Sequence, residues 1–249
     1  MAKDKITQAF ILGAGHGTRL KPLTDAMPKV MLPIAPGKPL LEHTIELLRN
    51  QGITDFVVNL HAFPAVIVDH FGSGKNWGVN ISYSDESERL LETGGAIKKA
   101  APLLHDDFLF LYGDELHFFD FAPLVDLHFR NNALTTIVLK GSEFPQDGDI
   151  GEADRETGRI LHWYTRPHGI TSLAENQKVN AGLYAISKRI LDYIPEDGPV
   201  KFDGEILPRA FAARDNLYAL LVSEPILDIG KPEKYEIAKE YYKRRKGEQ

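Results

Sequence analysis

The sequence contains no cysteine among its 249 residues, which excludes disulfide bonds, thiolate nucleophiles and zinc–thiolate sites. It has no excess of positive charge either, since 29 Lys and Arg stand against 35 Asp and Glu, for a formal net charge of -6. A broad nucleic-acid or anionic-membrane surface is therefore not expected. No uncharged apolar run approaches the length of a membrane span, and the N-terminal stretch lacks the apolar core of a signal peptide. We expect a cytoplasmic protein that binds neither nucleic acid nor membranes.

Several catalytic motifs are also absent. The nine histidines form no His-x-x-x-His pair, so no transition-metal site is expected. No serine stands in a Gly-x-Ser-x-Gly elbow, so a hydrolase triad has no support. The glycine-rich stretch near the N-terminus does not fit the dinucleotide fingerprint, because Thr18 stands where the third glycine should be, and no P-loop is present. A dinucleotide-dependent oxidoreductase is disfavoured accordingly.

Strand-like apolar runs alternate with helix-like stretches along the chain. This alternation predicts an α/β fold with a mostly parallel sheet and helices on both faces. Strands are expected at 9–12, 56–60, 79–83, 108–112, 134–139 and 217–222, and helices at 41–48, 64–70, 92–104, 121–131, 206–211 and 233–245. The less regular region 142–182, with strand-like pieces at 160–165 and 179–186, is expected to form an inserted, mixed subdomain over the sheet. With 43% apolar residues the chain can bury a full core without disulfide bonds or structural metal ions.

The stretch from Phe10 to Pro33 carries the strongest functional signal. A buried strand leads into three glycines at alternate positions, Gly13, Gly15 and Gly17, whose backbone N–H groups can approach a ligand closely. Clustered N–H dipoles of this kind bind anions, above all phosphate. Arg19 and Lys29 follow and supply two fixed cations, of which the arginine can bind two phosphate oxygens at once. On an acidic protein, this predicts a local phosphate site.

Two aspartates follow apolar segments far apart in the chain. Asp114 comes directly after the expected central strand 108–112, at the end of the sheet where ligands bind in open α/β folds. Asp228 follows Ile226 and Leu227 late in the chain. Hard oxygen ligands beside phosphates are the usual way of holding Mg²⁺. For Asp114 alone, capping of the next helix is the competing interpretation, and Glu115 next to it is expected to be a solvated loop residue.

The whole N-terminal stretch resembles the signature of the sugar-1-phosphate nucleotidylyltransferases. The signature reads Gly-x-Gly-Thr-Arg-Leu-x-Pro-Leu-Thr followed by Pro-Lys, and the matching residues are Gly15, Gly17, Thr18, Arg19, Leu20, Pro22, Leu23, Thr24, Pro28 and Lys29. The resemblance extends from Phe10 to about Tyr235 and includes the string from Asp228 to Pro232. It implies a Rossmann-like three-layer α/β/α fold in one domain, 1–249. Residues 1–140 would bind nucleotide, 141–225 would bind sugar, and a helix at 232–246 would follow, with no β-helix domain.

The resemblance also implies an activity: a nucleoside triphosphate and a sugar 1-phosphate would give a nucleoside-diphosphate sugar and pyrophosphate. Arg19, Lys29 and Asp114 would be catalytic, and Asp114 and Asp228 would share a Mg²⁺ ion. Nucleotide would be bound by Leu12, Gly13, Ala14, Gly15, Gly17, Thr18, Asn59, Glu92, Thr93 and Gly94. Thr93 is also a plausible N-cap of the helix that begins there, which would offer its N-terminal dipole to an anion. Asn59 and His61 end the preceding strand at the same edge, and a structural role competes for His61.

Arg166 and Asn180 would hold the sugar phosphate and the sugar. Thr165-Arg166-Pro167 departs from the family's Glu-Lys-Pro, which leaves the sugar open. Glu205 in Phe-Asp-Gly-Glu is a further acid that could reach the sugar, with a solvated surface position as the competing interpretation. A monomer or homodimer using GTP or UTP is expected. The alternatives are a cytidylyltransferase for a non-sugar phosphate such as phosphocholine and a non-catalytic sugar-nucleotide sensor.

Overall fold

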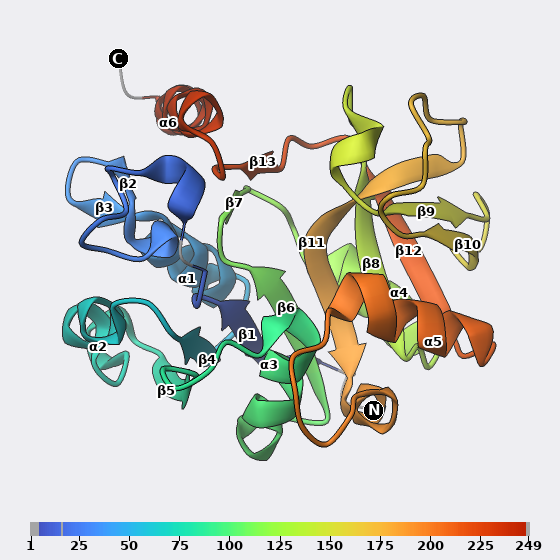
Figure 1. The fold of residues 1–249 in the computed structure, drawn as a ribbon, viewed down its shortest axis with the longest axis horizontal. Helices are drawn as coiled ribbons and strands as arrows, with labels where there is room; N and C mark the ends of the chain where they lie inside the picture. Colours follow the sequence, from blue (N-terminus) through green and yellow to red (C-terminus); the bar gives the residue numbers. More distant parts are fainter. Residues whose placement is uncertain (1–4, 16, 248–249) are drawn as a thin grey trace.

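A nine-stranded sheet forms the centre of the protein (Figure 1). The structure is a computed structural model that describes residues 5–15 and 17–247. The strand order is β10-β9-β11-β6-β1-β4-β5, and β8 pairs with both β11 and β12. The strands are β1 Gln8–Leu12, β4 Asp55–Leu60, β5 Asn80–Asp85, β6 Asp107–Tyr112, β8 Thr135–Lys140, β9 Ile150–Ala153, β10 Ile160–Tyr164, β11 Gln177–Ser187 and β12 Leu217–Val222.

Helices cover both faces of this sheet, which confirms the predicted three-layer α/β/α fold. They are α1 Leu40–Asn50, α2 Pro64–Phe71, α3 Glu92–Ala100, α4 Ala122–Arg130, α5 Leu207–Ala212 and α6 Pro232–Lys246. One apolar core includes buried residues of α1, α2 and α4, and a second core on the other face includes buried residues of α3 and α5. The alternation of strands and helices therefore predicted the layers correctly.

Strand β1 lies between β4 and β6 and runs parallel to both. Its side chains alternate between the two cores: Phe10 lies with Phe110 at a ring-centroid distance of 5.5 Å, and Ile11 lies in the opposite core. A strand buried on both faces is expected to be apolar throughout, as this one is. Because β1, β4 and β6 are parallel, their carboxyl ends meet at one edge of the sheet, where Leu12, Asn59 and Tyr112 lie side by side.

The region 142–182 does not form an inserted subdomain over the sheet, although the strands predicted at 160–165 and 179–186 are confirmed as β10 and β11. The strands β9, β10 and β11 of this region belong to the nine-stranded sheet, and β11 pairs with β6 in antiparallel orientation. Only five residues of β11 pair with β6, and its first residues pair with β9 instead. Along its length β11 changes partners, with a register shift against β8 between Asn180 and Tyr184.

Two small sheets lie beyond the carboxyl ends of the central strands. One pairs β2 Pro33–Ala35 with β3 Lys38–Pro39, and the other pairs β7 Glu115–Leu116 with β13 Leu227–Asp228. The helix α6 closes over β2, where the Tyr235 hydroxyl donates a hydrogen bond of 2.6 Å to the Pro33 carbonyl. Among the residues described, no helix combines the length and the apolar character that crossing a bilayer requires.

Candidate active site

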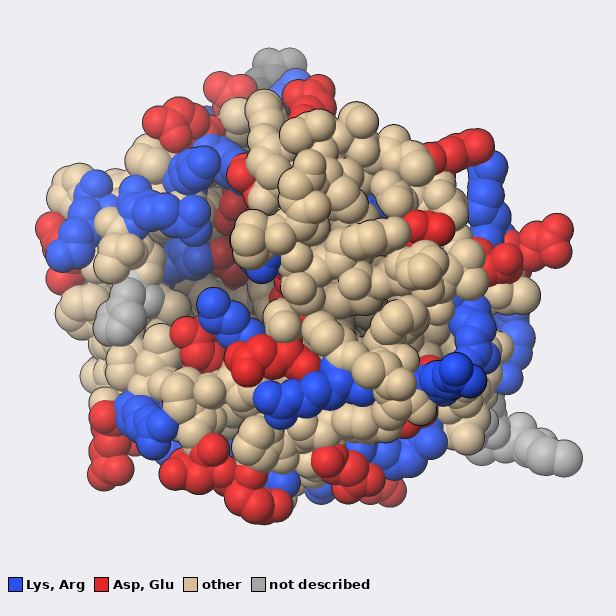
Figure 2. All heavy atoms as spheres, turned by 45° about the vertical axis from the view of Figure 1, so that its right-hand side comes forward, with Lys and Arg blue, Asp and Glu red and all other residues tan. Residues whose placement is uncertain are grey.

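Two cavities meet at the carboxyl end of the central strands. The larger has a volume of about 900 Å³ and the smaller about 200 Å³. Tyr112, the last residue of β6, and Asp114 line both of them. Figure 2 shows basic and acidic side chains facing one another around a hollow in the surface. This position, beyond the carboxyl ends of parallel strands, is where α/β folds bind ligands.

The glycine-rich loop lines the smaller cavity, but two of its amides are already used. The backbone N–H groups of Gly13 and Ala14 donate to Asn59 Oδ1 over 2.7 and 3.3 Å. The Asn59 amide in turn donates to Glu86 Oε1 over 2.8 Å, and both side chains are buried. Burial raises the pKa of Glu86, while the hydrogen bonds from Asn59 and the Leu91 amide act in the opposite direction. The Asn59 oxygen thus holds the loop amides, and the Asn59 nitrogen is fixed by Glu86.

The remaining loop residues divide between cavity and support. Leu12, Ala14, Gly15 and Asn59 line the smaller cavity, whereas Gly13, Gly17 and Thr18 are not among the lining residues of either cavity. Gly17 has a φ of 61°, in the left-handed region that favours glycine, and its carbonyl accepts a 2.9 Å hydrogen bond from the Thr24 hydroxyl. Gly17 therefore turns the chain so that Arg19 can point into the larger cavity.

Asp114 and Asp228 lie close together although they are far apart in sequence. The strands β7 and β13 pair so that Asp228 is opposite Glu115. The Ile229 amide donates a hydrogen bond of 3.0 Å to the Asp114 carbonyl. Each carboxylate has a lysine partner: Lys29 bonds to Asp114, and Lys234 bonds to Asp228 Oδ2 at 3.0 Å. Burial opposes ionisation of Asp228, but the hydrogen bonds from Lys234 and the Gly230 amide outweigh it and lower its pKa.

Arg19 reaches the same place from η1, a 3-10 turn over Thr18–Leu20. A Cβ atom on Gly230 would lie 2.6 Å from Asp228 Oδ1 and 3.1 Å from Arg19 Nη2. A side chain at position 230 would therefore displace the Asp228 carboxylate and press on the Arg19 guanidinium, which both lie against this glycine. Arg19, Lys29, Asp114 and Asp228 therefore converge at the junction of the two cavities.

Glu115 was expected to be a solvated loop residue, and this expectation is wrong. Its Oε2 is buried and makes no hydrogen bond within the described chain, with Lys140 Nζ at 3.6 Å. Burial raises the pKa of Glu115 to about 8; Lys140 opposes the shift, and the charges of Asp114 and Asp228 add to it. Three acidic side chains thus share a small volume, in which burial favours the neutral form of Glu115 near pH 7.

These residues fit a hard divalent cation. Carboxylate oxygens are the ligands that Mg²⁺ takes, usually one or two of them together with water and substrate phosphates. Among residues 5–15 and 17–247, no three acidic or histidine side chains are placed to enclose a metal ion by themselves. Asp114 and Asp228 would therefore hold such an ion only with oxygen atoms from water or a bound phosphate.

The segment at the start of α3 differs from the prediction in two ways. Thr93 is not the N-cap: the helix begins at Glu92, and the Thr93 hydroxyl accepts a 2.7 Å hydrogen bond from the Phe202 amide. The amides of Gly94 and Gly95 donate to the Val200 carbonyl over 2.8 and 3.2 Å, so they are not turned toward an anion. Glu92 and Thr93 line the smaller cavity, but Gly94 is buried beneath them.

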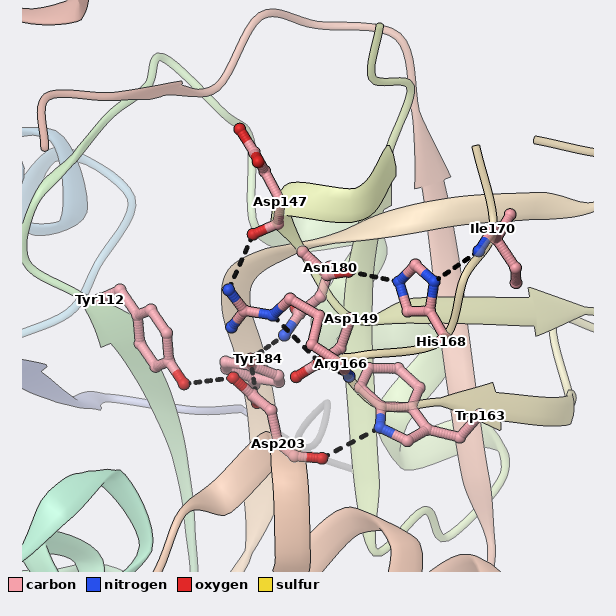
Figure 3. A network of polar contacts seen from close by, with 11 residues as sticks. Tyr112, Asp147, Asp149, Trp163, Arg166, His168, Ile170, Asn180, Tyr184 and Asp203 are labelled. Carbon is pink, nitrogen blue, oxygen red and sulfur yellow. Dashed lines mark hydrogen bonds and ion pairs between the residues drawn. The ribbon is translucent and has the colours of Figure 1, made fainter. Parts of the chain in front are cut away.

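Arg166 and Asn180 both line the larger cavity. Arg166 donates three hydrogen bonds to neighbouring residues (Figure 3). Its backbone amide and its Nε donate to the Asp149 carboxylate over 2.8 and 3.3 Å, and its Nη1 donates to the Asp147 carbonyl over 2.8 Å. The Asn180 side-chain amide donates a hydrogen bond of 2.6 Å to the Tyr184 hydroxyl, and its oxygen accepts a hydrogen bond of 3.1 Å from the Gly182 amide. The two residues thus lie at one end of the larger cavity, with Asp114 and Asp228 also on its wall.

Comparison with known proteins identifies the family. The family model described as nucleotidyl transferase matches residues 8–245. The chain belongs to this nucleotidyl transferase family. It is 32% identical over 241 residues to the UTP–glucose-1-phosphate uridylyltransferase of Synechocystis sp., covering 92% of this chain and 61% of that protein. It is 33% identical over 229 residues to the mannose-1-phosphate guanylyltransferase of Mycobacterium tuberculosis, covering 91% and 62%.

The fold is shared with solved structures as well. UDP-glucose pyrophosphorylase complexed with UDP-glucose superposes with a TM-score of 0.79 at 20% identity, over 97% of this chain and 100% of that one. This chain spans about three fifths of the length of the curated relatives that it matches. The predicted resemblance to the sugar-1-phosphate nucleotidylyltransferases is therefore confirmed at the level of family and fold.

Two residues of this nucleotidyl transferase site were missed by sequence reasoning. Tyr112 ends β6 and lines both cavities, and Asp203, in the π-helical turn η7 Phe202–Ile206, lines the larger one. Glu205 in the same Phe-Asp-Gly-Glu string is exposed and accepts a hydrogen bond from the Lys201 amide, which confirms the solvated surface position favoured for it. The available signal was the position of Asp203 directly after the fully buried Phe202.

Proposed function

We propose that this nucleotidyl transferase is a sugar-1-phosphate nucleotidylyltransferase. It would join a nucleoside triphosphate to a sugar 1-phosphate and release pyrophosphate. One observation carries the proposal: Arg19, Lys29, Asp114 and Asp228 come from four separate segments and converge where a small and a large cavity meet. A small cavity beside the glycine-rich loop suits a nucleoside, and a larger polar cavity suits a sugar phosphate and pyrophosphate.

The proposed reaction needs no general base. A phosphate oxygen of the sugar 1-phosphate is already anionic near neutral pH and would attack the α-phosphorus in line, while the bond to the pyrophosphate oxygen breaks. Catalysis then consists of positioning and charge stabilisation. Lys29, on the wall of the smaller cavity, would leave Asp114 to contact the α-phosphate. Arg19 would bind the departing pyrophosphate, and Arg166 would bind the phosphate of the sugar.

Mg²⁺ held by Asp114 and Asp228 would neutralise phosphate charge when bound. The residues themselves support this assignment, because two carboxylates from distant segments line one cavity, and Lys29 and Lys234 hold them in place there. A direct readout is binding of Mn²⁺ to the substrate-free protein, followed by electron paramagnetic resonance. Asp228→Asn is the variant expected to lose affinity, and Asp192→Asn, at an exposed position, is the control.

The relatives favour UTP or GTP as the nucleotide and glucose 1-phosphate or mannose 1-phosphate as the partner, because these substrates stand in their names. The test is a grid of five nucleoside triphosphates against a panel of sugar 1-phosphates, scored by pyrophosphate release with and without Mg²⁺. Phosphocholine belongs in the panel with CTP. Release from at least one sugar 1-phosphate, dependent on Mg²⁺, is expected. Release from phosphocholine alone would replace the proposal by the cytidylyltransferase alternative, and no release at all would refute it.

A further inference from the structure

A buried carboxylate with two tyrosine partners forms part of the wall of the larger cavity. Tyr112 and Tyr184 both donate their hydroxyl groups to Asp203, the first to Oδ2 and the second to Oδ1 at 2.6 Å (Figure 3). Asp203 is only 8% exposed, yet it lines the cavity together with Asn180 and Arg166. The catalytic roles proposed above make no use of it.

The backbone around Asp203 is held in place from both sides. The Trp163 indole donates a hydrogen bond of 3.0 Å to the Asp203 carbonyl. The amide of Phe202, the residue before Asp203, donates a hydrogen bond of 2.7 Å to the Thr93 hydroxyl. Thr93 lines the smaller cavity, so the segment that carries Asp203 is attached directly to the nucleotide side of the site. A carboxylate fixed in this way is preorganised for a ligand, because little freedom remains to be lost on binding.

Asp203 retains hydrogen-bonding capacity. An ionised carboxylate offers about four acceptor positions. The two tyrosines occupy one position on each oxygen. Each oxygen therefore keeps about one acceptor position, and because Asp203 lies on the cavity wall a bound ligand could supply the donors. Two hydroxyl groups on neighbouring carbon atoms of a sugar ring present two donors side by side, which matches the two oxygens of one carboxylate.

The charge around the carboxylate agrees with a neutral, hydroxylated ligand. Asp149 and Arg166 are the charged groups that act on Asp203 from the neighbouring loops, with opposite signs. Asp149 is itself bound to Arg166, so the two charges that act on Asp203 from these loops offset each other. A sugar with an additional carboxylate would meet Asp203 directly and be repelled.

We propose that Asp203 is the specificity-determining residue of the larger cavity and accepts hydrogen bonds from two adjacent hydroxyl groups of the sugar ring. This inference rests on the proposed function. It identifies the substrate class as a neutral sugar 1-phosphate with an intact pair of adjacent hydroxyls, and it excludes uronic acid 1-phosphates. Tyr112 and Tyr184 act as positioning residues that orient the carboxylate.

The experiment compares wild-type protein with Asp203→Asn on the sugar 1-phosphate that the grid selects and on its monodeoxy analogues. Glu205→Gln is the matched control, because it removes an exposed acid two residues away on the same turn. We expect Asp203→Asn to lower kcat/KM for the parent sugar by about 10- to 100-fold, chiefly through KM for the sugar phosphate. KM for the nucleotide and all constants of Glu205→Gln should stay within about twofold of wild type.

The deoxy analogues separate recognition from support of the fold. At one or two ring positions, deoxygenation should cost the wild type at least about tenfold in kcat/KM and cost Asp203→Asn less than about twofold, because the partner is already gone. Equal deoxygenation penalties in both proteins would overturn the inference, since a structural role predicts them. Efficient use of a uronic acid 1-phosphate by the wild type would also overturn it.

The two proposals fail in different ways. If the wild type releases no pyrophosphate from any pair in the grid, the proposed function fails. If the wild type is active and Asp203→Asn matches it on every analogue, only the present inference fails. Should Asp203→Asn not fold, as judged by thermal unfolding, Asp203→Glu keeps the charge and moves it by one methylene. That variant is expected to change the order of preference among the deoxy analogues, and an unchanged order would count against the inference.

Discussion

Replacing Asn59 by aspartate should destabilise the protein in a way that one further substitution repairs. The Asn59 oxygen accepts from the amides of Gly13 and Ala14, and its nitrogen donates to Glu86 over 2.8 Å. In Asn59→Asp the two amides keep their acceptor, but the donor facing Glu86 becomes a second carboxylate oxygen. The variant therefore tests the arrangement that shapes the glycine-rich loop without changing the volume of the side chain.

The size of the effect follows from electrostatics. Two unit charges about 3 Å apart repel by about 5 kcal/mol at an effective dielectric constant of 20. Protonating one of the two acids at pH 7 costs about 3–4 kcal/mol, and this cheaper route limits the penalty. The expected loss is about 3 kcal/mol in the free energy of unfolding, or roughly 5–15 °C in Tm for a chain of this length. Glu86 is the natural site of the added proton, because burial already raises its pKa.

The loss should depend on pH with a defined sign. The folded variant holds a shared proton that the unfolded chain releases above about pH 4. Its stability relative to wild type therefore rises as the pH falls from 7 toward 4, by about 1.4 kcal/mol per pH unit. Thermal or urea unfolding at several pH values measures this slope.

The double variant Asn59→Asp with Glu86→Gln is the decisive control. The new amide at position 86 can donate to the new carboxylate at position 59 and accept from the Leu91 amide, which Glu86 Oε2 now accepts at 3.0 Å. Charge and hydrogen-bond number then equal those of the wild type, so stability should return to within about 1 kcal/mol. A double variant as unstable as the sum of the two single variants would refute the described pairing, as would a stable Asn59→Asp at pH 7.

Two further predictions concern catalysis and acid stability. Lys29→Ala should lower kcat by about 10²–10³-fold and raise KM for the nucleotide far less. Pyrophosphate release measures both constants, and Lys21→Ala on the exposed surface is the control. An unchanged kcat would show that Lys29 takes no part in the reaction. Burial lowers the pKa of His43 to about 4 and that of His117 to about 3, so the unfolded chain takes up protons below about pH 6.5 that the folded protein refuses. Stability should therefore fall as the pH drops from 6.5 toward 4, and His43→Gln should reduce that slope by up to about 1.4 kcal/mol per pH unit in urea titrations, whereas exposed His105→Gln should not.

Much of the fold was predictable because its signals are local. The apolar run at 108–112 and the period of residues 41–48 indicate a buried strand and an amphipathic helix, and β6 and α1 lie there. In the region 142–182 the strand-like pieces were predictable, but their place in the main sheet was not. β11 pairs with β9 near its start, with β6 near its end and with β8 along both parts, and no local pattern encodes such a choice of partners. The roles of the individual site residues stay predictions.

The sequence by itself determined the family and pointed to the stretch from Phe10 to Pro33 and to Asp114 and Asp228 as candidate site residues. Only the tertiary structure decided which groups are left for a ligand. It placed Asn59 on the amides of Gly13 and Ala14, the Val200 carbonyl on the start of α3, and Asp203 beneath two tyrosines. The physical reason is that a donor which is already hydrogen-bonded within the protein is not available to a ligand. Here the acceptors lie in segments that are distant in sequence, and only packing brings them to their donors.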